Sequence, residues 1–232
     1  MFKQPIHKMF QQRITKQEVS AMPTVSFNGD IIVVDDEYKI PECVNFLSQQ
    51  PILGVDTETR PAFSRGKQNK TSLLQISSLT RCYLIQLNHI GLPQPIANIL
   101  ANPDIIKVGL AFSDDLRGLK RITPFEPQNC IDIQSIVHNY GILDLGLQKI
   151  YAIIFGQRIS KTQRLTNWEN KHLTLLQQKY AATDAWATLC IYNALMRSKK
   201  LPQKEVKKLL EADKQLQIQH QQEIINAKEH AE

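Results

Sequence analysis

The sequence predicts an α/β protein in which a mixed β-sheet is flanked by α-helices. Short apolar segments follow one another in the first part of the chain, as expected for strands, and the segment that ends at Asp56 and Glu58 is short and β-branched. Later, helix-like and strand-like segments alternate, which is typical of a sheet covered by helices. The 232 residues can bury one sizeable core, so we expect one domain with terminal extensions.

The first part of the chain is expected to form four strands and one helix. The strands cover residues 29–34, 53–57, 72–76 and 81–86, and the helix covers residues 41–50. Residues 77–80 are short enough to be a hairpin loop between the last two strands. Antiparallel strands are therefore expected in this part of the sheet.

The second part is expected to be mainly helical. We expect a helix at 96–101, a strand at 105–108, a helix starting near Ser113, and helices at 133–140 and 145–155. The clearest helix start is Thr174, followed three residues later by Gln177 in the pattern of a capping box. Four residues separate Tyr180 from Asp184 in that helix, so the two side chains share one face.

Charge and composition suggest three regions. We divide the chain into a basic N-terminal extension (1–25), a central domain (26–198) and a helical C-terminal tail (199–232). Residues 1–22 hold four basic groups and one acidic group, and the whole chain has a net charge of +6. Beyond Pro202 the tail is polar and helix-prone with scattered apolar positions, which indicates an appendage or a partner-binding helix and not a second domain.

The sequence contains no membrane or export signal that we can identify. No segment approaches the roughly 18 apolar residues needed to span a bilayer, and the N-terminus lacks the apolar core of a signal peptide. Cys43, Cys82, Cys130 and Cys190 are too far apart for a zinc knuckle or a redox motif. We therefore expect an intracellular, cytoplasmic protein that does not contact membranes.

Asp56 and Glu58 end an apolar strand and are the first candidates for a functional site. Residues two apart in a strand point to the same face, so both carboxylates can approach one point. A solvated strand end is the ordinary interpretation of such a pair. If the pair is buried, either one acid takes up a proton or a hard cation such as Mg²⁺ or Mn²⁺ holds both.

Two further acidic motifs complete a resemblance to a known family. Asp115 follows a strand and a turn, and Tyr180 precedes Asp184 by four residues. Together with Asp56 and Glu58, these motifs resemble the 3′-5′ exonucleases of the DEDD superfamily. The closest branch is the DEDDy branch, which includes the Werner-type exonuclease domain and ribonuclease D. The resemblance covers about residues 30–197.

The resemblance implies a ribonuclease H-like fold and a metal-dependent reaction. In this family, the terminal phosphodiester at a 3′ end of nucleic acid is hydrolysed to release nucleoside 5′-monophosphates with two divalent ions, Mg²⁺ or Mn²⁺. The implied metal ligands are Asp56, Glu58, Asp115 and Asp184. Tyr180 is implied to orient the attacking water, since a tyrosine with its usual pKa of about 10 is protonated at neutral pH.

The second motif contains two adjacent acids, and only one can face the metals. Successive residues at a helix start are rotated by about 100°. The family pattern selects Asp115, eight residues after Lys107. We expect Ser113 to cap the helix and Asp114 to lie in its first turn without contacting the metals.

Substrate contacts are expected beside the carboxylates. From Thr59 to Pro103 the chain has no acidic residue, and basic residues begin directly after Glu58. A basic segment next to a metal site suits a polyanion. The expected contacts are Thr57, Arg65, Lys67, Lys70 and Phe112, the last against a terminal base. Lys161 and Arg164 could contact phosphates, but exposed charges of a linker are the ordinary interpretation.

Three alternatives remain open at this stage. The favoured substrate is DNA, but the same chemistry on RNA differs only by contacts to a 2′-hydroxyl. A second alternative is a non-catalytic nucleic-acid-binding module of the same fold. A third is a scaffold whose helical tail binds an unknown protein partner. Retention of all four acids and the tyrosine argues against the non-catalytic module.

Overall fold

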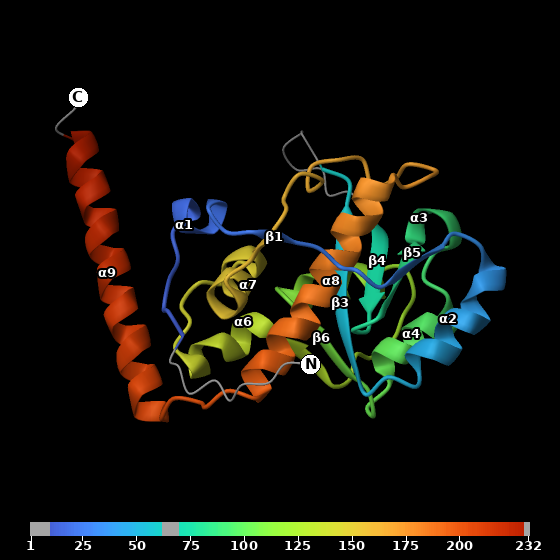
Figure 1. The fold of residues 1–232 in the computed structure, drawn as a ribbon, viewed down its shortest axis with the longest axis horizontal. Coiled ribbons are helices and arrows are strands. Elements are labelled where there is room, and N and C mark those ends of the chain that lie inside the picture. Colours follow the sequence, from blue (N-terminus) through green and yellow to red (C-terminus); the bar gives the residue numbers. More distant parts are fainter. Residues whose placement is uncertain (1–9, 62–69, 230–232) are drawn as a thin grey trace.

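A six-stranded mixed sheet forms the centre of the molecule. The computed structural model describes residues 10–61 and 70–229. The strands lie in the order β2-β5-β4-β3-β6-β7 (Figure 1). Their bounds are β2 Asp30–Val34, β3 Ile52–Thr59, β4 Thr71–Ser77, β5 Arg81–Gln86, β6 Ile106–Gly109 and β7 Cys130–Asp132. The predicted mixed sheet is confirmed.

Strand directions follow the length of the connections. β3, β4 and β5 are antiparallel neighbours, as expected from the short loop at residues 77–80. β2 pairs with β5 in parallel, and β6 pairs in parallel with both β3 and β7. Parallel pairs need longer crossovers, and helices provide them here.

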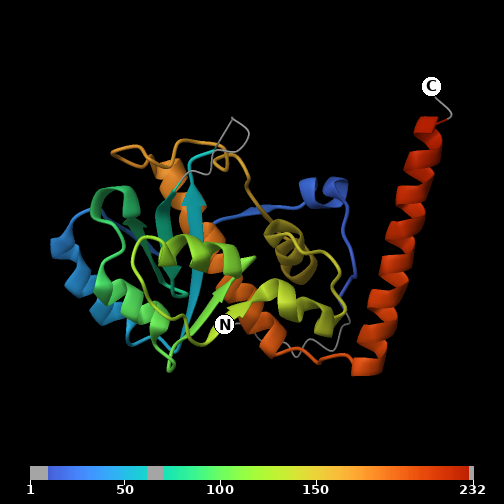
Figure 2. The ribbon, with the colours of Figure 1, turned by 180° about the vertical axis from the view of Figure 1, so that it is seen from behind.

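Helices cover both faces of the sheet. The long helix α8 (Leu175–Met196) crosses one face, and α2 (Ile40–Leu47), α4 (Gln94–Ala101) and α5 (Phe112–Lys120) cover the other (Figures 1 and 2). α8 lies very close to β3 because Gly54 has no side chain: a Cβ there would be 2.0 Å from the backbone oxygen of Ala185. This close approach brings residues of α8 beside the acids of β3.

The start of α8 is confirmed in detail. The Thr174 hydroxyl accepts a hydrogen bond from the Gln177 backbone N–H, and the Gln177 side chain accepts one from the Thr174 backbone. The helix predicted at 133–140 consists of α6 (Ile133–Ile136) and a 3₁₀ turn, η2 (Val137–Tyr140). α7 (Leu147–Phe155) packs against α8 beyond the β7 edge.

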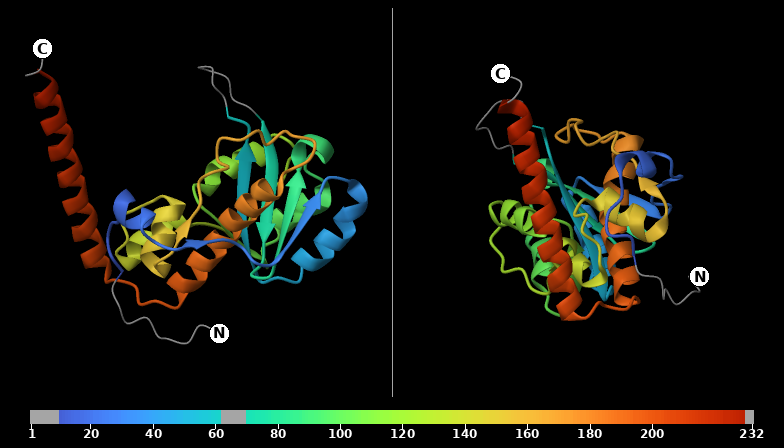
Figure 3. Two further views of the ribbon diagram at one scale, coloured as in Figure 1. Left: turned by 45° about the horizontal axis from the view of Figure 1, so that its top comes forward. Right: turned by 90° about the vertical axis from the view of Figure 1, so that its left-hand side faces the viewer.

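Both described terminal segments contain regular secondary structure. In the N-terminal segment, α1 (Lys16–Ser20) packs on α7, and β1 (Thr24–Val25) pairs with β8 (Arg158–Ile159). At the other end, α9 (Gln203–Glu229) projects from the body (Figure 3). The remaining short elements are η1 (Glu37–Lys39) and α3 (Leu87–Ile90). None of the described helices combines the length and apolar character needed to cross a bilayer.

Candidate active site

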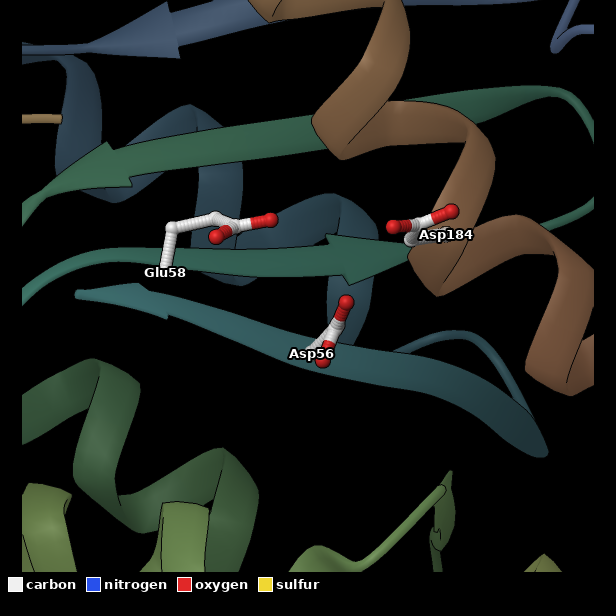
Figure 4. A group of neighbouring side chains, drawn as sticks. All are labelled: Asp56, Glu58 and Asp184. Atoms are coloured by element: carbon white, nitrogen blue, oxygen red, sulfur yellow. The ribbon is translucent and has the colours of Figure 1, made fainter. Parts of the chain in front are cut away.

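Three carboxylates from two elements meet at one point. Asp56 and Glu58 leave the same face of β3, the face covered by α8, because they are two residues apart in an extended strand. Asp184 comes from the middle of α8. One carboxylate oxygen from each lies within 4.8 Å of the others. Figure 4 shows the three side chains directed toward a common space.

The pKa values of these acids are raised because their charges are buried together. Burial is the largest cause for each, and raises the pKa of Glu58 to about 8 and that of Asp184 to about 7. The pKa of Asp56 lies well above its usual value because of burial and then the charges of Asp184, Asp115 and Glu58. The deprotonated cluster therefore needs positive charge nearby.

The donor set fits a hard divalent cation. Within the described part of the chain, all three grouped ligands are carboxylate oxygens, with no histidine or cysteine among them. Oxygen-only ligands suit Mg²⁺ and Mn²⁺, and a cation would replace the protons that the metal-free cluster retains. Asp56, Glu58 and Asp184 are thus the residues that could hold a metal.

Tyr180 lies one helical turn before Asp184. Its side chain lines a cleft that also contains Asp56, Glu58 and Asp184. Burial and then the charges of Asp184 and Glu58 raise the pKa of its hydroxyl above its usual range. The hydroxyl lies near the Asp184 carboxyl and lowers the pKa of that acid, and the ring of Tyr180 packs against Trp168, with 6.0 Å between ring centroids. Tyr180 is therefore a protonated, positioned donor at the edge of the carboxylates.

Asp115 lies beside the three grouped acids but outside their 4.8 Å cluster. It extends from α5 and accepts a hydrogen bond of 2.5 Å from the Thr57 hydroxyl on β3. Burial raises the pKa of Asp115 to about 6, and the Thr57 hydrogen bond opposes that rise. Its charge also raises the pKa of Asp56 and Glu58, so it belongs to the same electrostatic site.

The predicted cap of α5 is wrong. The helix begins at Phe112, so Ser113 is inside its first turn, and the N-cap is Ala111 in the left-handed region at φ 55°. The backbone N–H groups of Ala111 and Phe112 donate to Asp132, which replaces the expected serine cap. Asp114 is exposed and pairs with Arg117, so Asp115 is the acid of the two that faces β3.

The expected substrate-contact residues do not lie together in one place in the structure. Phe112 is only 2% exposed and packs in the core, so it does not present its ring to a terminal base in this structure. Thr57 holds Asp115. Lys70 lines a separate cleft of about 620 Å³ together with Arg121 and Glu169. Arg65 and Lys67 lie outside the described residues.

The carboxylates lie in a cleft of about 770 Å³ with several basic side chains. Lys161 and Arg164, interpreted from the sequence as solvent charges, line this cleft and lower the pKa of Asp184 and Glu58 respectively. Both residues are exposed, but their position in the segment leading to α8 was the signal that could have identified them. The cleft thus offers positive charge next to the candidate metal ligands.

Comparison with known proteins assigns the family. Residues 31–200, well over half of the chain, match the family model described as 3′-5′ exonuclease. The chain belongs to the 3′-5′ exonuclease family. The resemblance drawn from the three acidic motifs is therefore confirmed, and the grouped acids become candidate catalytic residues of an exonuclease.

Relatives of this exonuclease include proteins named for different activities. The bifunctional 3′-5′ exonuclease/ATP-dependent helicase WRN of Mus musculus is 27% identical over 188 residues, covering 75% of this chain and 13% of that protein. Ribonuclease D of Haemophilus influenzae is 30% identical over 166 residues, covering 70% of this chain and 41% of that protein. The chain spans less than half the length of either relative.

A solved structure confirms the fold. The crystal structure of the Nibbler EXO domain of Aedes aegypti matches with a TM-score of 0.68 and 20% sequence identity, over 81% of this chain and 100% of that chain. The central sheet and its covering helices therefore have the fold of that domain.

Proposed function

We propose that this exonuclease hydrolyses the terminal phosphodiester at the 3′ end of a nucleic acid strand, with DNA as the first candidate substrate, and releases nucleoside 5′-monophosphates. The observation that carries the proposal is the group of three carboxylates within 4.8 Å of one another, in a cleft with basic side chains. In the reaction, a water oxygen attacks phosphorus, the bond from phosphorus to the 3′-oxygen breaks, and that oxygen takes a proton.

Each residue has a role that follows from its surroundings. Asp56, Glu58 and Asp184 would hold two divalent ions, with Asp115 as the fourth carboxylate. When bound, the ions lower the pKa of water and stabilise the charge on the leaving oxygen. Tyr180 keeps its proton and orients the attacking water through its hydroxyl. Lys161 and Arg164 place positive charge near the phosphates.

Either polymer satisfies the chemistry of the carboxylates. The names of the two relatives point to a helicase-linked exonuclease and to a ribonuclease. A 2′-hydroxyl contact would distinguish RNA from DNA. DNA and RNA strands of matched sequence therefore need to be compared directly.

The test uses the full chain on 5′-labelled DNA and RNA with Mg²⁺ or Mn²⁺. A ladder that shortens from the 3′ end supports the proposal, and the relative rates select the polymer. The Asp56→Asn variant is the matched control, because it keeps the side-chain size and removes the charge. Cleavage in excess EDTA, or by the variant at the wild-type rate, would overturn the metal-dependent mechanism.

A further inference from the structure

The N-terminal segment forms part of the cleft that holds the carboxylates. Lys16, Val19 and Ser20 of α1 line the same cleft as Asp56 and Asp184. These residues precede the stretch 31–200 that matches the exonuclease family. α1 therefore forms a wall of the cleft and lies outside the stretch that matches the family model.

A buried carboxylate holds this wall in place. Asp144 is 5% exposed and accepts a hydrogen bond of 2.7 Å from the backbone N–H of Ile14. The same carboxylate pairs with Lys149 of α7 at 2.7 Å and with Arg13 at 3.8 Å. Arg13 also reaches Asp213 of α9 at 2.6 Å. Asp144 thus joins the N-terminal segment to α7.

Apolar packing and backbone pairing add to this attachment. Ile14 and Val19 are buried against Ala152 of α7. Further along, β1 pairs with β8 in parallel, and the backbone N–H of Phe27 donates to the Thr183 hydroxyl of α8 at 3.0 Å. The segment is fixed at both ends of α1, so the position of α1 is defined by the fold.

The cleft carries positive charge that suits a nucleic acid backbone. Five basic residues line the cleft, namely Lys16, Lys149, Arg158, Lys161 and Arg164. Lys16 is exposed and forms no salt bridge with any described residue, whereas Lys149 is paired with Asp144. An exposed, unpaired lysine on the cleft wall can neutralise a phosphate without losing another partner.

We propose that the N-terminal segment 10–25, fixed by Asp144, binds the phosphate backbone of the single-stranded 3′ segment upstream of the scissile bond, with Lys16 as a direct phosphate contact. The inference rests on the proposed function. A strand whose terminal phosphodiester reaches the carboxylates has to leave through the cleft, and α1 lies on its border. The wall would therefore favour strands long enough to reach α1 over very short ones.

The first test compares two lysine-to-glutamate variants of the full chain. Lys16→Glu changes the wall, and Lys207→Glu makes the same charge change on exposed α9. Binding of labelled single strands of about 12 nucleotides, and of a trinucleotide, is measured by anisotropy in EDTA, where no hydrolysis is expected. Lys16→Glu should weaken binding of the longer strand by about two- to fivefold and lower the salt slope by about 0.7 or more.

The outcomes separate this inference from the proposed function. A loss that is confined to Lys16→Glu and larger for the longer strand supports the wall. Equal losses in both variants, or none, would overturn it. Hydrolysis of the same strands by the wild-type protein with Mg²⁺ is measured separately. If the strands bind but are not cleaved, the proposed function fails; if they are cleaved but Lys16→Glu binds as well as the wild type, only the role of α1 fails.

The second test addresses Asp144. Asp144→Asn keeps the size of the side chain but weakens its bonds to Ile14 and Lys149. It should speed trypsin cleavage after Arg13 or Lys16 and reduce affinity for the longer strand. Asp213→Asn is the control, because it weakens the α9 contact of Arg13 and leaves Asp144 in place. Faster cleavage without weaker binding would contradict the proposed role of the wall, and thermal unfolding identifies a variant that does not fold.

Discussion

Two adjacent aspartates on α5 face different surroundings. Asp115 accepts a hydrogen bond from Thr57 on β3, whereas Asp114 is exposed and pairs with Arg117 on the same helix. A rotation of about 100° per residue is sufficient for this difference. The two residues have the same chemistry, so their positions alone make Asp115 a candidate metal ligand and Asp114 a surface charge.

We expect Asp115→Ala to remove most exonuclease activity and Asp114→Ala to retain most of it. The first change deletes a carboxylate of the buried electrostatic site, and the second deletes an exposed ion pair, which contributes little to stability. Steady-state hydrolysis of a labelled strand, with thermal unfolding of both variants as a check on folding, provides the measurement. Reversed phenotypes would show that the other aspartate serves the site.

The hydroxyl of Tyr180 is expected to affect turnover more than binding. Tyr180→Phe keeps the ring against Trp168 and deletes one hydrogen-bond donor beside Asp184. The rate should fall by about 10²- to 10⁴-fold, the range of positioned proton-transfer and orienting groups. Tyr140→Phe, at a buried tyrosine of the α6–α7 side, is the matched control. Wild-type kcat in Tyr180→Phe with saturating metal would leave the tyrosine with a packing role alone.

At the scale of elements, the sequence predicted what is encoded locally. The short apolar segments of β3, β4 and β5 and the capping box at Thr174 depend on neighbouring residues, and all four were identified. β1 and β8 have two residues each, and their pairing joins segments more than 130 residues apart. The cap of α5 was missed for the same reason, since Asp132 binds the start of a helix twenty residues earlier.

As with the helices and strands, the parts of the candidate site that depend on local spacing could be predicted from the sequence. The spacing of Asp56 and Glu58 in a strand and of Tyr180 and Asp184 in a helix was sufficient to place them together. The burial of Phe112 and the presence of α1 in the cleft depend on tertiary packing, which motif spacing does not contain. Local periodicity therefore identifies the acids better than it identifies the surfaces that contact substrate.

The contact between β3 and α8 is expected to be intolerant of added volume. Gly54→Ala would place a Cβ 2.0 Å from the backbone oxygen of Ala185, next to Asp184, so α8 would have to move. We expect a loss of stability of about 1–3 kcal/mol or more, together with reduced activity. Gly146→Ala, where a Cβ meets no atom within 4 Å, is the control for thermal unfolding. Equal unfolding midpoints for the two variants would contradict this account of the helix–strand contact.

At the scale of the whole molecule, the carboxylate cluster couples folding to pH and to metal. In the unfolded chain a glutamate has a pKa of about 4.3, whereas burial raises the pKa of Glu58 to about 8 in the folded protein. Between these values the folded protein binds more protons than the unfolded chain. The free energy of unfolding therefore falls as pH rises through this range. The stability that comes from keeping Glu58 protonated is lost above about pH 8.

We expect the metal-free protein to be less stable at about pH 8.5 than at about pH 5.5, by roughly a few kcal/mol, since one pKa unit corresponds to about 1.4 kcal/mol. Thermal or urea unfolding in EDTA at both pH values measures the difference. Mg²⁺ should restore stability mainly at the higher pH, because it binds the deprotonated acids of the folded state. Glu58→Gln cannot ionise at this position, so it should show a smaller fall with pH than the wild type. A wild-type stability that is constant or rises between the two pH values would contradict the raised carboxylate pKa values and weaken the assignment of these acids to a metal site.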